Sequence, residues 1–253
     1  MLLHRFSAGR VERRLLDGNS SPVVVETEGG RFVLKLRGAG HGVLALVAEI
    51  VVAELAERLS LSVPERAVVA LPPDVPSAEK NDELADLLAR STGTNLGLRL
   101  LEGARVATAS ELDALDDEFV ARVLWLDGLT LNPDRTGSNP NVLVWKGRPW
   151  LIDHGSSLAF HHDWRSVTED SPREPWSHRR HVFSSRASLV PRFDAILTPL
   201  VDRQALDAAV GAVPDEFLED VEPGTAPNVT RAAYVAFLWK RLKPPRPFAS
   251  DVA

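Results

Sequence analysis

Residues 11 to 60 contain the feature that most constrains the fold, because three short strand-like segments are followed there by one long helix-like segment. Apolar and polar residues alternate in three places, over 11–16, 23–27 and 31–36. Turn residues separate these segments, and a glycine-rich stretch, 38–42, follows the third. Residues 43–60 are rich in Ala, Leu and Glu and contain no Gly or Pro, as helices prefer. The pattern predicts an antiparallel three-stranded meander that leads into a helix, which is the start of an α+β fold.

The second half of the chain has a more helical character. An acid-rich start at 110–118 predicts a helix that continues towards Gly128. After a polar loop at 131–141, two apolar segments on either side of a Lys-Gly-Arg-Pro turn predict a β-hairpin that ends at Asp153. Further elements are expected as strands at 66–71 and 98–101 and as helices at 82–89, 196–210 and 230–242.

Charge and composition limit the partners that we expect. The 29 basic and 35 acidic residues give a formal net charge of -6, so the chain has no overall positive field for a polyanion, and we expect no nucleic-acid partner. The absence of cysteine excludes disulfides, thiolate metal sites and cysteine nucleophiles. The longest apolar run, 43–53, is far short of the roughly 20 residues that cross a bilayer. With no signal-peptide pattern at the N-terminus either, we expect no membrane span and a cytoplasmic location.

The polar loop and the hairpin contain the clearest chemical pattern. Asp134 and Asn139 are five residues apart, and Asp153 follows the second strand of the hairpin. Metal-assisted phosphoryl transfer needs a carboxylate that orients the attacking hydroxyl, and Asp and Asn oxygens that hold Mg²⁺. Protein kinases have the same Asp-x-x-x-x-Asn spacing, then a hairpin, then Asp-Phe-Gly, and this chain has Asp-His-Gly at 153–155. Asn141 is a second amide in the loop and remains an alternative to Asn139.

The first half of the chain supplies the groups that bind phosphates in a kinase. Lys35 lies in an apolar strand and Glu49 in the helix that follows, which is the order of the lysine and glutamate that pair in kinases. The turn between the first two strands offers backbone N–H groups and hydroxyls that could cover phosphates, in Gly18, Asn19, Ser20 and Ser21. Each motif is short, so the order of all four is what predicts a kinase.

On these residues the sequence resembles the HipA-like kinases, a bacterial branch of the protein-kinase-like fold. The shared pattern runs from Gly18 to about Leu158 and includes a Leu-Glu-Gly-Ala stretch at 101–104. The resemblance implies a two-lobed protein-kinase-like fold, with a β-rich N-lobe that carries one long helix, residues 1–104, and a mostly helical C-lobe, residues 105–253. The hinge would lie at about 98–104.

The resemblance also implies residue roles. Lys35 would bind the phosphates of ATP, Glu49 would pair with Lys35, and Asp134 would be the catalytic base. Asn139 and Asp153 would hold Mg²⁺, and the backbone at Leu101 and Glu102 would bind adenine. Relatives often have a histidine where this chain has Thr136. The chain has no room before Val11 for the additional N-terminal subdomain of the HipA toxins, so the resemblance does not carry over an antitoxin partner.

The phosphoacceptor is left open by the sequence, and other functions compete. A Ser or Thr hydroxyl of a protein is the first expectation; a small molecule or lipid is the alternative, and so is an inactive nucleotide-binding scaffold. The polar stretch 160–187 lies where kinases keep an activation segment. A His- and Asp-rich region from Asp153 to His181 suggests a zinc or iron hydrolase, and Gly155-Ser156-Ser157 weakly resembles the nucleophile turn of a serine hydrolase.

Overall fold

A closed five-stranded β-barrel forms the first part of the computed structural model, which describes residues 3–15 and 21–249. The strands lie in the order β1-β2-β3-β5-β4. Their bounds are β1 His4–Arg14, β2 Val23–Thr27, β3 Gly30–Lys35, β4 Arg66–Leu71 and β5 Gly93–Arg99. The predicted meander is confirmed, since β1 pairs with β2 and β2 with β3, both antiparallel. The barrel closes because β1 also pairs with β4 in parallel, which the sequence pattern did not predict.

The barrel encloses a small apolar core of its own. Alternate residues of β2, β3 and β4 point inward, as the period of two requires, and among them are Val23, Val25, Phe32 and Leu34. The helix α2 (Asp82–Arg90) adds Leu84, Leu87 and Leu88 to the same core. The predicted helix at 82–89 is therefore confirmed, and its first turn is capped by the Asn81 side chain, which accepts a hydrogen bond from the Leu84 amide at 3.1 Å.

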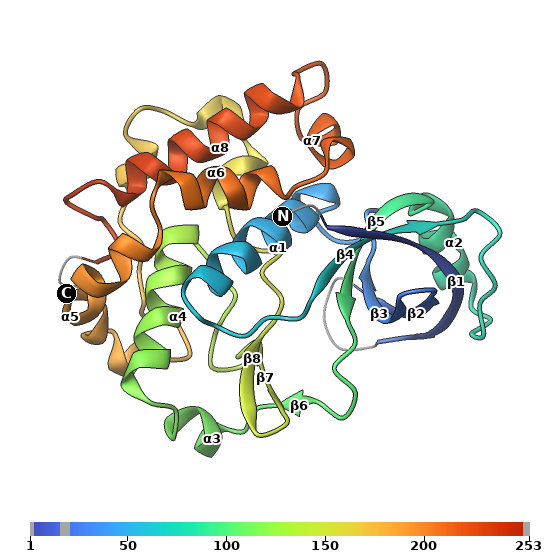
Figure 1. The fold of residues 1–253 in the computed structure, drawn as a ribbon, viewed down its shortest axis with the longest axis horizontal. Coiled ribbons are helices and arrows are strands. Elements are labelled where there is room, and N and C mark those ends of the chain that lie inside the picture. The colour runs from blue at the N-terminus through green and yellow to red at the C-terminus, as the bar shows by residue number, and fades with distance from the viewer. Residues whose placement is uncertain (1–2, 16–20, 250–253) are drawn as a thin grey trace.

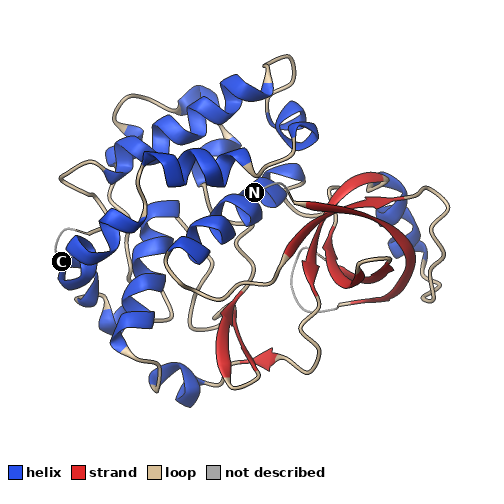
Figure 2. Cartoon of the chain, in the orientation of Figure 1, coloured by secondary structure: helices blue, strands red, loops and turns tan. Residues whose placement is uncertain are grey.

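A second and larger core lies among the helices (Figures 1 and 2). The long helix α1 (Val43–Arg58) packs there against α4 (Asp117–Thr130), α6 (Arg203–Gly211) and α7 (Asp215–Val221). Most of α1 is buried on every side, which is why its sequence is almost uninterruptedly apolar. The helices α5 (Leu189–Leu197) and α8 (Pro227–Leu242) complete this core. The helix that follows the meander thus contributes to the core among the helices.

Two predicted helices are each divided in the structure. The helix expected from 110 is two helices, α3 (Ala109–Asp113) and α4, because Asp116 has an extended backbone and caps α4 by accepting from the Phe119 amide at 2.7 Å. The helix expected at 196–210 is divided among the end of α5, a 3₁₀ turn at Thr198–Leu200 and α6. Pro199 lies at the break and has no backbone N–H to continue a helix. The helix α7 was not predicted.

The predicted hairpin is confirmed and leads directly to Asp153. Strands β7 (Val142–Trp145) and β8 (Arg148–Leu151) pair antiparallel, and the short β6 (Arg105–Val106) joins them in a three-stranded sheet. The chain from 159 to 188 has only short 3₁₀ helices, at Ala159–His162, Trp164–Ser166, Ser171–Arg173 and Ser184–Arg186. Within residues 3–15 and 21–249, no helix is long and apolar enough to cross a membrane.

Candidate active site

A cavity of about 570 Å³ lies between the barrel and the hairpin sheet, within the size range of ligand pockets. The barrel contributes Val33 and Lys35 from β3, and the hairpin side contributes Leu143, Ile152 and Asp153. The connection that follows β5 lines the cavity with residues 98–106, which include Leu101 and Glu102 of the predicted hinge. Residues from both halves of the sequence therefore meet around one space.

Lys35, Glu49 and Asp153 form an ion cluster at the wall of this cavity. The Lys35 Nζ donates to Glu49 Oε1 and, at 2.5 Å, to Asp153 Oδ1. Glu49 is buried, whereas the Asp153 side chain keeps 35% of its surface exposed. Burial opposes the charge of Lys35, but the two carboxylates outweigh burial and raise its pKa above the usual value. Lys35 is 14 positions from Glu49 and 118 positions from Asp153 along the chain, and the structure brings all three together.

The turn after β8 is held against α1 by the same glutamate. The Gly155 amide donates to Glu49 Oε1 at 2.9 Å, and a Cβ added at Gly155 would lie 3.1 Å from the Ala45 Cβ of α1. Asp153 itself has a φ of 56°, a left-handed conformation that Asp tolerates better than most residues. Burial opposes ionisation of Asp153, but Lys35 outweighs it and lowers the pKa of this carboxyl. Asp153 is thus ionised and partly exposed beside the cavity.

The polar loop gathers its own residues around Asp134. The Asn139 Nδ2 donates to Asp134 Oδ2 at 3.0 Å, and the Asn141 Nδ2 reaches the same oxygen at 3.3 Å. Asn139 is exposed and Asn141 is buried. The carboxylates of Asp134 and Asp153 and the amide oxygen of Asn139 are hard oxygen donors, so this donor set fits Mg²⁺ in kind.

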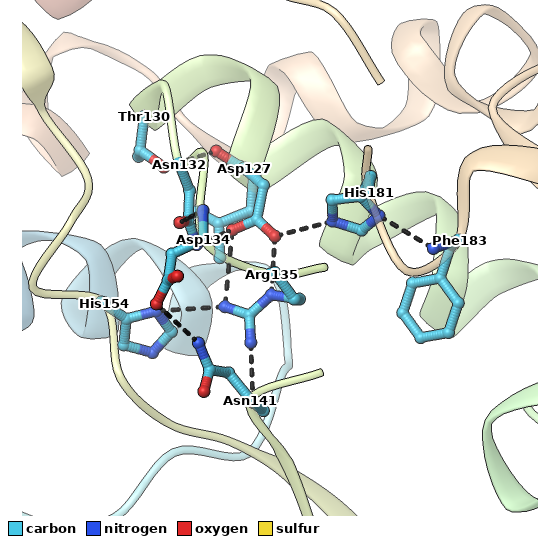
Figure 3. A network of polar contacts seen from close by, with 10 residues as sticks. Asp127, Thr130, Asn132, Asp134, Arg135, Asn141, His154, His181 and Phe183 are labelled. Atoms are coloured by element: carbon cyan, nitrogen blue, oxygen red, sulfur yellow. Dashed lines mark hydrogen bonds and ion pairs between the residues drawn. The ribbon is translucent and has the colours of Figure 1, made fainter. Parts of the chain in front are cut away.

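Behind this loop lies a second ion cluster, which is fully buried (Figure 3). The Arg135 Nε donates to Asp127 Oδ2 at 2.6 Å, and the Asn132 Nδ2 donates to Asp127 Oδ1 at 2.9 Å. The His181 Nε2 lies 3.0 Å from Asp127 Oδ2. Burial opposes the charge of Asp127, but Arg135 and His181 outweigh it and hold its pKa well below the usual value.

The roles of Asp127 and His181 are not visible in the motif pattern. Asp127 does have a signal, since it is the one charged residue in the apolar run from Val123 to Leu131, and a charge there must be paired. His181 has none, because its partner is 54 positions away.

The buried histidines each have a different partner. His154 Nδ1 lies 3.3 Å from Arg135 Nη2, His161 Nδ1 lies 2.9 Å from the Tyr234 hydroxyl, and His178 Nε2 lies 3.2 Å from the Phe248 carbonyl. Burial lowers the pKa of both His154 and His161 to about 3, so both are neutral. In the described parts of the chain, no group of three or more His, Cys, Asp or Glu is arranged to hold a metal ion.

The remaining predicted residues lie at the edges of the site. Gly18, Asn19 and Ser20 lie outside the described residues, while the Ser21 Oγ accepts from Arg14 Nη2 at 2.7 Å. In the hinge, the Glu102 carbonyl accepts from the Trp145 indole N–H at 2.9 Å, which ties the hinge to the hairpin.

Comparison with solved structures and with family profiles gives matches to this chain. The solved structure of the Helicobacter pylori proinflammatory kinase CtkA matches with a TM-score of 0.55 and 11% sequence identity, over 95% of this chain and 98% of that chain, which shows a shared fold. A search of curated proteins finds no match. The sequence profile of a family described as HipA-like kinase matches residues 9–243. The predicted resemblance is therefore confirmed, and the chain belongs to the HipA-like kinase family.

Proposed function

We propose that this kinase uses Mg²⁺-bound ATP and transfers the γ-phosphoryl group to a Ser or Thr hydroxyl of a protein. The observation that carries the proposal is the ion cluster of Lys35, Glu49 and Asp153 at the wall of the cavity. A buried lysine that is held between a helix glutamate and a partly exposed aspartate is the arrangement that positions phosphates in kinases. In this proposal the barrel and α1, within residues 1–104, act as the N-lobe, residues 105–253 act as the C-lobe, and ATP binds between them.

The proposed nucleotide site follows the lining of the cavity. The adenine ring lies between the apolar side chains of Val33, Leu101 and Leu143 and is oriented by the hinge backbone at Leu101 and Glu102. The phosphates extend towards Lys35, whose charge stays fixed because its pKa is raised. The turn at residues 18–21 would cover the phosphates.

Asn139 and Asp153 would hold the Mg²⁺, which would neutralise the charge of the phosphates. Asp134 accepts the proton of the acceptor hydroxyl. Its carboxylate is oriented for this role by the amides of Asn139 and Asn141, which both donate to Oδ2 and leave Oδ1 for the hydroxyl. A positioned general base of this kind contributes about 10²- to 10⁴-fold to turnover.

Calorimetric titration with ATP, with and without Mg²⁺, tests the nucleotide site. We expect wild type to bind in a Mg²⁺-dependent way and Asp153→Asn to lose that dependence, while Asp134→Asn binds as wild type does and loses about 10²- to 10⁴-fold in turnover. Asp207→Asn is the matched control, because Asp207 forms an exposed pair with Arg203 on α6 and does not line the cavity. Absence of ATP binding by wild type would overturn the proposal.

The acceptor class is decided by a separate comparison. In this comparison, the protein is incubated with ATP and either casein or a set of hydroxylated metabolites and lipids. A small-molecule or lipid kinase would leave casein and itself unmodified and would phosphorylate a metabolite or lipid. An inactive nucleotide-binding scaffold would bind ATP yet release no phosphate in any of these assays. Retention of Asp134, Asn139 and Asp153 together favours an active enzyme over a scaffold.

A further inference from the structure

The buried cluster around Asp127 is connected to the proposed catalytic base by two routes. In the first, Asn132 donates through Nδ2 to Asp127 and accepts through Oδ1 from the Asp134 amide at 3.0 Å. In the second, Arg135 donates from Nε to Asp127 and from Nη1 to the Asn141 carbonyl at 2.7 Å, and the Asn141 side chain donates to the Asp134 carboxylate. Both the backbone and the carboxylate of Asp134 are therefore oriented through Asp127.

The same carboxylate also holds a distant segment of the chain (Figure 3). The Phe183 amide donates to His181 Nδ1 at 3.1 Å, so the proton of the ring lies on Nε2, which donates to Asp127. The Val182 amide donates to the Arg135 carbonyl at 2.9 Å, and His181 forms a β-bridge with Thr136. The segment 178–183 is thus docked along the loop that carries Asp134.

We propose that Asp127 is a positioning residue that makes the geometry of the catalytic base depend on docking of segment 178–183. Asp127, Arg135 and His181 have side chains no more than 1% exposed, so they act through other residues and do not touch a substrate. Every partner of the Asp127 carboxylate is a donor. Loss of one donor leaves the buried charge of Asp127 less well compensated and its carboxylate fixed by fewer hydrogen bonds. Undocking of the segment therefore loosens the geometry in which this carboxylate holds Arg135 and Asn132. This inference rests on the proposed role of Asp134, and it adds a way in which whatever binds segment 178–183 would control the enzyme.

Hydrogen exchange of the full chain, followed by mass spectrometry, tests the coupling. His181→Leu removes the donor at similar volume, and His181→Gln restores a donor near the position of Nε2. We expect His181→Leu to speed exchange in residues 131–141 as well as in 178–183, while His181→Gln and the control Asp207→Asn leave 131–141 as in wild type. ATP affinity should stay within about twofold in all three, because Lys35 and Asp153 are not contacted by His181.

Turnover separates a positioning role from a structural one. With water as the acceptor of phosphate, we expect His181→Leu to lower kcat by about 10²-fold, the effect of misplacing a reacting group, at unchanged KM for ATP.

Faster exchange that stays confined to 178–183 would overturn the inference. If His181→Leu does not fold, native-state exchange in wild type decides: the Val182 and Asp134 amides must open with the same free energy, and different free energies overturn the coupling. Failure of wild type to bind ATP would refute the proposed function but not this coupling.

Discussion

The two ion clusters of the molecule have similar parts but different exposure. In the first, Lys35 donates to the carboxylates of Glu49 and Asp153, and in the second, Arg135 and His181 donate to the carboxylate of Asp127. The first cluster lies at a cavity, where the Asp153 side chain is 35% exposed, whereas the side chains of Asp127 and Arg135 have no exposed surface at all. The first can therefore meet a ligand, while the second can only hold other residues in place.

This difference indicates how charge is used in the two places. In the first cluster two carboxylates share one lysine, so one of them can be given up to a metal without leaving the lysine unpaired. In the second cluster one carboxylate serves three donors, and among residues 3–15 and 21–249 no second carboxylate contacts these donors. A charged group that binds a ligand must be able to change its partner, whereas a charged group that holds other residues in place must keep its partners.

The largest expected effect comes from matched substitutions in the two clusters. Asp127→Asn places an amide donor against donors and leaves Arg135 buried without its counter-charge, so we expect the free energy of unfolding to fall by about 3–5 kcal/mol. Asp153→Asn leaves Lys35 paired with Glu49, and we expect a change of at most about 1 kcal/mol. Urea denaturation of both variants and wild type measures the two values. Equal losses in the two variants would contradict the comparison.

A smaller effect is expected from acid. The folded pKa of Asp127 is lowered, so its contribution to stability is fully present above the unfolded pKa of about 3.9 and is lost as the pH falls below that value. Wild type should therefore lose stability more steeply than Asp127→Asn below about pH 4, by up to about 1.4 kcal/mol per pH unit for one proton. The two stability curves should converge as the pH falls from 4 to 2. Parallel curves would show that Asp127 does not depend on Arg135 and His181 for its charge.

Sequence predicted the first cluster well and the second hardly at all. Lys35, Glu49 and Asp153 follow a fixed order of motifs on a strand, a helix and a hairpin, and each element was recognisable from its periodicity. The second cluster depends on the path of residues 159–188, which has only 3₁₀ turns and no periodic pattern. Without that path, no spacing rule relates His181 to Asp127.

The fold shows the same limit. Local patterns gave the meander, β4, the hairpin and most helices, whereas the strand expected at 98–101 lies at Gly93–Arg99 and β6 was not predicted. Closure of the barrel by β1 and β4 is a pairing of segments about 60 residues apart. The burial of α1 among α4, α6 and α7 also depends on packing between distant elements. Most residues of α1 are buried, but its sequence does not indicate against which part of the chain they pack.

The smallest effect that we predict tests how closely the first cluster is packed. Gly155→Ala adds a Cβ 3.1 Å from Ala45 Cβ and 3.4 Å from Glu49 Oε1, so α1 or the turn must shift by a few tenths of an ångström. We expect a loss of about 1 kcal/mol in the free energy of unfolding, at the low end for overpacking, and a fall of about fivefold in ATP affinity, because Glu49 moves relative to Lys35.

Gly211→Ala at the end of α6 is the control for this substitution, since its added Cβ meets nothing within 4 Å, and because helices prefer Ala to Gly we expect no loss of stability and a gain of up to about 1 kcal/mol. Urea denaturation and ATP titration of both variants make the comparison. Unchanged ATP affinity in Gly155→Ala, together with the expected loss of stability, would mean that the contact between α1 and the Asp153 turn serves packing alone. In that case only Lys35 and Asp153 of the first cluster would contribute to ligand binding, and Glu49 would not.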